Sequence, residues 1–200
     1  MRFFTKNEFS VVFTTLFLIG VLAYFNFQVS FRKSRDSQRR EDLGAVYNAL
    51  NSFKSDFGFF PPASPDGRII ACKGDNFDSV VAELKKLKEF DLNLYITGLA
   101  PCDWGWDSLS EFTNDQTYLT SIPTDPLHQK GYRYFYISNS RRFQIFASLE
   151  GGTKEIGYST PIVNRNLTCG TSVCNTGRAY STTPLEISLE EYENELLEIK

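Results

Sequence analysis

An apolar run at residues 9–31 contains no charged side chain and is rich in Phe, Val and Leu. As an α-helix rising about 1.5 Å per residue, it would reach roughly 34 Å, enough to cross a hydrocarbon core of about 30 Å. A secretory signal peptide would have a shorter apolar stretch and a small-x-small cleavage site, and no clean Ala-x-Ala follows Leu22. The run therefore predicts an uncleaved single-pass anchor, with the lipid bilayer as a partner.

Basic side chains flank this run on both sides. Residues 1–40 hold seven Lys or Arg and two Asp or Glu, whereas residues 41–200 hold fourteen Lys or Arg and twenty-two Asp or Glu. The net charge of −3 therefore combines a basic N-terminal segment with an acidic body. An acidic body does not attract nucleic acid by bulk charge, so no nucleic-acid partner is expected. Counting positive charges alone would place the body in the cytoplasm, although large domains are exported despite such a bias.

The four cysteines favour export of the body. They are Cys72, Cys102, Cys169 and Cys174, and four cysteines allow three pairings. The natural pairing is Cys72 with Cys102 and Cys169 with Cys174, because each closes a loop rich in Gly, Asp or Asn. A zinc site is one alternative, but no Cys-x2-Cys is present and His128 is the only histidine. Reduced core thiols are the other alternative. We predict disulfides, an oxidising compartment and a body outside the cytoplasm.

A helical pattern continues beyond the apolar run. Between Leu43 and Phe57, apolar side chains recur every three or four residues and form a stripe on one face. The first proline is Pro61, so one helix from Glu8 to Phe57, roughly 75 Å long, is allowed. Gly58 and the prolines that follow are expected to end it. The stripe then needs a domain that covers it.

The remaining chain supplies elements for that domain. We expect a short strand at 68–72, an amphipathic helix at 77–90, a hairpin of strands at 132–137 and 143–149, and a tail helix at 188–199. Adjacent strands are expected to hold Tyr134, Tyr136, Phe143 and Ile145, and both tryptophans, Trp104 and Trp106, are expected to pack inward. Ser188 with Glu191 resembles a helix-capping box.

These elements predict an α+β fold: a long N-terminal helix, half transmembrane and half amphipathic, packed on a small antiparallel sheet head. The expected divisions are a basic N-terminus at 1–8, a transmembrane segment at 9–31, an amphipathic continuation at 32–57, a globular head at 58–187, and an acidic C-terminal helix at 188–200.

Three stretches resemble one protein family. The first is Phe4-Thr5, then Glu8, then the apolar run. The second is SRDSQRREDL at 34–43, continuing to Asp56-x-Gly and Pro61. The third is Pro-Thr-Asp-Pro at 123–126 before Gly131-Tyr132. In this order they resemble the type IV pilins and the type II secretion pseudopilins, whose mature chains begin with Phe-Thr and have a glutamate just inside the apolar helix.

The resemblance implies a structural subunit of a type IV pilus or a type II secretion pseudopilus-like filament, anchored in the inner membrane before assembly. Its implied partners are copies of itself or other pilin-like subunits and the assembly machinery of the inner membrane. Glu8 and Phe4 are the implied assembly residues. Phe3 and Phe4 flank the possible leader-processing position, although the family has glycine where this chain has Phe3.

Glu8 has two further interpretations. It can mark the helix start, where the positive helix end favours an acid, or pair with Arg2 or Lys6 of another uncut chain. Some relatives of the resembled family bind calcium near the Asp-Pro turn, which makes Asp125 and Asp115 candidate ligands, while Asp125 alternatively caps a turn. Otherwise no cofactor is expected.

No catalytic constellation is evident in the sequence. A single histidine without a second base at a suggestive spacing disfavours Ser-His or Cys-His catalysis, so we expect a protein that is not an enzyme. The alternative to a filament subunit is a non-polymerising single-pass membrane protein whose exported domain binds a ligand or partner.

Overall fold

A single helix spans more than a quarter of the chain. The computed structural model describes residues 6–111 and 116–198, and its first element is α1 (Lys6–Phe57), 52 residues long and unbroken. The expected continuous helix is confirmed, with no interruption between Arg32 and Leu43. Gly58 ends it: its φ of +80° is readily adopted only by glycine, and its N–H donates to the carbonyl of Lys54 at 2.7 Å.

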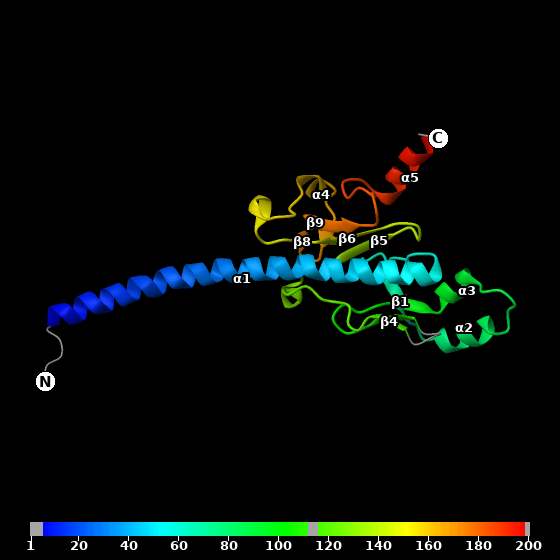
Figure 1. Ribbon diagram of the computed structural model, residues 1–200, viewed down its shortest axis with the longest axis horizontal. Helices are drawn as coiled ribbons and strands as arrows, with labels where there is room; N and C mark the ends of the chain where they lie inside the picture. Colours follow the sequence, from blue (N-terminus) through cyan, green and yellow to red (C-terminus); the bar gives the residue numbers. More distant parts are fainter. Residues whose placement is uncertain (1–5, 112–115, 199–200) are drawn as a thin grey trace.

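The head lies on both sides of the second half of α1 (Figure 1). On one side is a three-stranded antiparallel sheet in the order β5-β6-β9, formed by β5 (Phe135–Ser138), β6 (Phe143–Ala147) and β9 (Thr176–Ala179). On the other side is β4 (Gln116–Leu119), which pairs with β3 (Leu109–Glu111). Strands β4, β6 and β9 all contact α1, so the fold is α+β as predicted.

Smaller elements complete the head. Strands β1 (Ile70–Lys73) and β2 (Leu99–Pro101) pair antiparallel, as do β7 (Thr168–Cys169) and β8 (Ser172–Val173). The helical segments are α2 (Phe77–Leu84), α3 (Leu92–Thr97), α4 (Thr160–Asn164), α5 (Leu189–Glu198) and the short 3-10 turns η1 (His128–Lys130) and η2 (Gly152–Lys154). Ser188 caps α5, because its hydroxyl accepts from the N–H of Glu191 at 3.1 Å.

The core forms where the stripe of α1 meets the sheets. Leu43, Val46, Leu50 and Phe53 on the helix are fully buried. They belong to one apolar cluster with buried side chains of the head, namely Phe60, Ile69, Tyr95, Leu109, Tyr136, Phe143 and Ile145. The period of the stripe therefore identified the face of the helix that the head covers.

Three expectations about the head need correction. Helix α2 ends at Leu84 rather than near residue 90, and Leu87 and Phe90 beyond it remain exposed, although the ring of Phe90 lies 5.4 Å from that of Tyr95. Tyr134 precedes strand β5 instead of lying in it, although it is buried. Trp104 packs against the core, but Trp106 is 88% exposed and does not pack inward.

Candidate functional site

The first half of α1 projects from the head (Figure 1). In this single chain the large apolar side chains from Phe9 to Phe31 are between 38% and 66% exposed. The helix is long and apolar enough to cross a membrane, and none of its most apolar window is buried within the protein. Such a surface is unfavourable in water, so it requires lipid or other apolar helices around it.

Polar groups within this segment are compatible with an apolar surrounding. The hydroxyls of Thr14 and Thr15 donate to the carbonyls of Ser10 and Val11, each at 2.9 Å. A hydroxyl satisfied within its own helix does not need water.

Glu8 lies exposed in the first turn of α1, immediately before the apolar run. The positive end of the helix dipole favours a carboxylate at this position. Phe3 and Phe4 lie outside the described residues.

Arg39 lies at the other end of the uncovered segment, where α1 enters the head, and its side chain has no exposed surface. Its Nε and Nη2 donate to the two carboxylate oxygens of Asp125 at 2.7 and 2.9 Å, a two-pronged geometry that matches the planar guanidinium. Its Nη1 donates to Asp36 at 2.7 Å and to Glu150 at 2.9 Å. One side chain of the helix therefore binds three carboxylates, of which two belong to the head.

The carboxylates around Arg39 have further partners. Asp36 accepts from the backbone N–H groups of Glu150 and Gly151, both at 2.9 Å. Glu150 also accepts two hydrogen bonds from Arg35, at 2.7 and 2.6 Å. We call Arg35, Asp36, Arg39, Asp125 and Glu150 the junction network. Its hydrogen bonds link two successive turns of α1 to two separate loops of the head.

The junction network shifts the pKa values of Glu150 and Arg39. Burial disfavours the charged form of Glu150, but the hydrogen bonds from Arg35 and Arg39 outweigh it and hold the pKa of that carboxyl below its ordinary value. Burial likewise opposes the charge on Arg39, and its bonds to Asp125, Glu150 and Asp36 nevertheless raise its pKa. These shifts favour the charged forms of Glu150 and Arg39, and each of these two side chains has an oppositely charged partner.

A tyrosine–carboxyl pair lies one turn further along the helix. The hydroxyl of Tyr134 donates to the carboxylate of Asp42 at 2.6 Å. Burial is the main reason that the pKa of each group is raised, and the hydrogen bond to Asp42 adds to the shift of Tyr134.

The Asp-Pro turn was a candidate calcium site. Both carboxylate oxygens of Asp125 accept from Arg39, and one of them also accepts from the N–H of Leu127 at 2.7 Å. Asp115 lies outside the described residues. Across residues 6–111 and 116–198, no group of three or more His, Cys, Asp or Glu side chains is arranged to hold a metal ion. Asp125 thus has two roles in this fold: it caps its own turn and it pairs with the helix.

Sequence reasoning identified Asp125 but missed its partners. Asp36 and Arg39 stand three residues apart in a helix, a spacing that brings their side chains together, so that half of the junction network was detectable. Glu150 follows a buried strand more than a hundred residues later, and no local pattern links it to Arg39.

The cysteines form the two expected disulfides. Cys72 bonds to Cys102 and Cys169 to Cys174, with Cα–Cα distances of 5.1 Å in both, and the described chain has no free cysteine. The first bond joins β1 to the chain just after β2, and the second closes the β7–β8 turn. Both are buried in the head, and the strands β1 and β8 near them lie on opposite sides of α1 (Figure 1).

Comparison of this chain with protein-family models, with curated proteins and with solved structures finds no match. The assignment of a role therefore depends on the helix, the junction network and the motifs of the chain itself. The long N-terminal helix with small antiparallel sheets is compatible in shape with the family that the three sequence stretches resemble.

Proposed function

We propose that this protein is a structural subunit of a pilin-like filament and that the apolar half of α1 anchors it in the inner membrane before assembly. The observation that best supports this is the uncovered apolar surface on an unbroken helix, beginning directly after Glu8. In a membrane, lipid covers this surface. In a filament, the corresponding helices of neighbouring subunits cover it, and the heads form the outside.

The junction network fits this role. A subunit that leaves the membrane and packs among others must present its helix in a constant position relative to its head. Arg39 is fully buried and bonds to both the helix and the head, so the exit point of α1 is held by charge-assisted hydrogen bonds. The two disulfides stabilise an exported head by a different mechanism, because they restrict the conformations of its unfolded state.

Glu8 has a specific role in this proposal. A carboxylate at the start of a lipid-buried helix is costly, and such residues usually have a function. We propose that it pairs with the terminal amine of a neighbouring subunit during assembly, which requires processing at Phe4. The pairing would align incoming subunits and neutralise two opposite charges in the apolar interior.

The test is the replacement Glu8→Gln in the full chain, expressed with its own assembly machinery. Two quantities are measured: the fraction retained in membranes after alkaline carbonate washing, and the amount in sedimentable filaments. We expect normal membrane retention and a loss of filaments. Glu41→Gln, which changes an exposed acid on the same helix, is the matched control and should leave both unchanged.

Two results would reject the proposal. One is an unmutated chain that forms no sedimentable filaments under conditions in which its machinery is active. The other is unchanged filament yield in Glu8→Gln. Mass spectrometry of the extracted N-terminus provides an independent check, because a new terminus at Phe4 is required for the proposed amine partner.

A further inference from the structure

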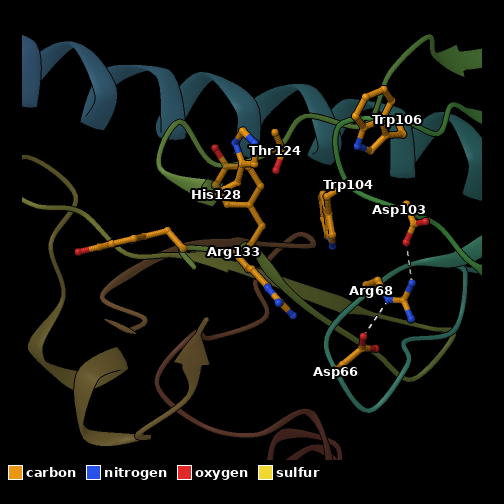
Figure 2. Close-up of a pocket in the computed structure, with 10 residues that line it drawn as sticks. Asp66, Arg68, Asp103, Trp104, Trp106, Thr124, His128 and Arg133 are labelled. Atoms are coloured by element: carbon orange, nitrogen blue, oxygen red, sulfur yellow. Dashed lines mark hydrogen bonds and ion pairs between the residues drawn. The ribbon is translucent and has the colours of Figure 1, made fainter. Parts of the chain in front are cut away.

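A recess on the head brings together both tryptophans of the chain (Figure 2). Its volume is about 410 Å³, within the range of small-molecule sites. Three segments form it: the loop before β1, the turn after β2, and the chain from Thr124 to Tyr134 that leads into β5. Its chemically distinctive members are Arg68, Asp103, Trp104, Trp106, Tyr132 and Arg133.

Trp106 is exposed but its backbone is held in place. Its side chain is 88% exposed, an unfavourable position for the largest aromatic ring. The turn beneath it is closed by bonds from the N–H groups of Trp106 and Asp107 to the carbonyl of Asp103, at 3.2 and 3.0 Å. Gly105 adopts a φ of +89°, and its N–H donates to the carbonyl of Ile122 at 2.7 Å. The indole is therefore presented to solvent from an ordered turn, which lowers the entropic cost of binding to it.

Trp104 contributes an unsatisfied donor. Its Nε1 is buried and has no hydrogen-bond acceptor among the described residues. Its ring packs edge-on against Tyr134 at 5.7 Å, and in Figure 2 the nitrogen end of the indole points toward the part of the recess where Arg68 and Arg133 lie. A buried donor without an acceptor costs free energy, which an oxygen of a bound molecule would recover.

Two kinds of charged group line the recess: Arg68 is paired with carboxylates, whereas the cation of Arg133 is not. Arg68 donates to Asp66 and to Asp103, each at 2.8 Å, so these side chains orient one another. The guanidinium of Arg133 is exposed and has no ion-pair or hydrogen-bond partner within the described chain. The recess thus offers both carboxylate acceptors and guanidinium donors beside two indoles.

This combination matches the chemistry of a sugar ring. A pyranose has one face of C–H groups, which stacks on an aromatic ring, and a rim of hydroxyls, each of which both donates and accepts. Asp103 can accept from such a hydroxyl, while Arg68, Arg133 and Trp104 Nε1 can donate to its oxygens. A purely apolar ligand would leave these polar groups unpaired, and a small inorganic anion would not use Trp106.

We propose that this recess is a saccharide-binding site, in which a sugar ring stacks on Trp106 and its hydroxyls bond to the Arg68–Asp103 pair, to Trp104 Nε1 and to Arg133. The site gives the head a ligand whether or not the chain polymerises, so its test is independent of the filament proposal.

The experiment uses the intrinsic fluorescence of the full chain, since both tryptophans of the protein line the recess. The chain is kept in a polyoxyethylene detergent, because glycoside detergents would present sugars of their own. The probes are chitotriose, cellotriose and trigalacturonate, titrated to about 10 mM, a range that detects weak sites. We expect a saturable change in emission with at least one of them.

Three variants test the assignment. Trp106→Ala should weaken the binding of the responding probe about tenfold or more, as expected for loss of a stacking surface. Phe90→Ala, which removes an exposed aromatic ring away from the recess, is its matched control and should bind like the unmutated chain. Arg133→Ala should also weaken binding, and a loss restricted to trigalacturonate would identify Arg133 as the partner of a sugar carboxylate.

Two outcomes would overturn the proposal. The first is no response to any of the three saccharides, whether or not oligothymidylate gives one, since bases also stack on aromatic rings and arginines. The second is unchanged binding by Trp106→Ala.

Discussion

Arg39 is a fully buried cation on a helix whose first half is exposed and whose second half is covered by the head. Its burial is tolerated because the nitrogens of the guanidinium all bond to carboxylates. Two of these three carboxylates, those of Asp36 and Asp125, are themselves fully buried. Buried ion pairs contribute little net free energy compared with apolar replacements, but breaking one leaves its partner as an unpaired buried charge. Replacing Arg39 therefore lowers the free energy of unfolding mainly because it leaves its carboxylate partners buried without a positive charge.

Arg39→Met leaves Asp36 and Asp125 buried beside an apolar side chain. We expect it to lower the free energy of unfolding of the head by about 3–5 kcal/mol. The measurement is urea unfolding of the full chain in detergent, followed by near-UV circular dichroism. Arg40→Met is the matched control: Arg40 is the next residue, its side chain is 31% exposed, and its loss should cost less than about 1 kcal/mol. Equal losses in the two variants would contradict a special role for Arg39.

Glu150 makes the stability of the head depend on pH. Burial opposes its charge, but the bonds from Arg35 and Arg39 lower its pKa in the folded state below the ordinary value of 4.5. The unfolded state therefore binds the proton more tightly, so this contribution is fully present above pH 4.5 and is lost as the pH falls through the lower, folded pKa. Asp42 acts in the opposite direction because burial raises its pKa.

Glu150→Gln isolates this contribution. The difference in unfolding free energy between the unmutated chain and Glu150→Gln should be largest near pH 7 and should shrink as the pH is lowered below 4.5. The measurement is a series of urea unfolding curves for both proteins across that range. A difference that stays constant with pH would mean that the carboxylate charge of Glu150 contributes nothing.

At the scale of elements, the two disulfides restrain segments of different length. The Cys72–Cys102 bond spans 30 residues and encloses α2 and α3, whereas the Cys169–Cys174 bond spans 5 and closes only the β7–β8 turn. In the chain-entropy account a longer loop loses more freedom in the unfolded state, so the first bond should stabilise the head more.

Paired Cys→Ala replacements measure the two effects separately. We expect removal of the Cys72–Cys102 bond to cost about 3–4 kcal/mol and removal of the Cys169–Cys174 bond about 2 kcal/mol, from loop length alone. Urea unfolding gives both values, and thiol labelling of the denatured, unreduced parent should detect no free thiol. Labelling of all four cysteines would show that the bonds do not form in the cell and would favour a reducing compartment.

The elements that could be predicted are those with local signals. The stripe from Leu43 to Phe57 has the helical period, and Gly58 has the properties of a helix end, so α1 was predictable in full. The extent of α2 was not, because its end depends on what covers Leu87. Trp106 was expected inside because large aromatic rings usually are, and no local pattern marks a ring that is presented to solvent. The Arg39–Glu150 contact depends on the path of the chain through the six strands β1 to β6 that lie between these two residues.

At the scale of the whole molecule, the head and the uncovered half of α1 have different requirements. The head buries its core around the second half of the helix and presents polar surface, while the first half has no covering of its own. The apolar surface of residues 9–31 is therefore removed from water only when lipid or a bundle of similar helices surrounds it. Both environments are apolar, which is why exchange between them need not change the fold.

The junction network has a mechanical consequence. Since α1 is unbroken and Arg39 bonds to the helix and to the head at once, the head cannot turn about the helix axis without breaking buried hydrogen bonds. Because the helix is continuous, a rotation of the head about the helix axis also turns the apolar side chains from Phe9 to Phe31. The orientation of the head thus sets the direction in which the apolar side chains point, as far as Phe9, about 45 Å from Arg39 along the helix at 1.5 Å per residue.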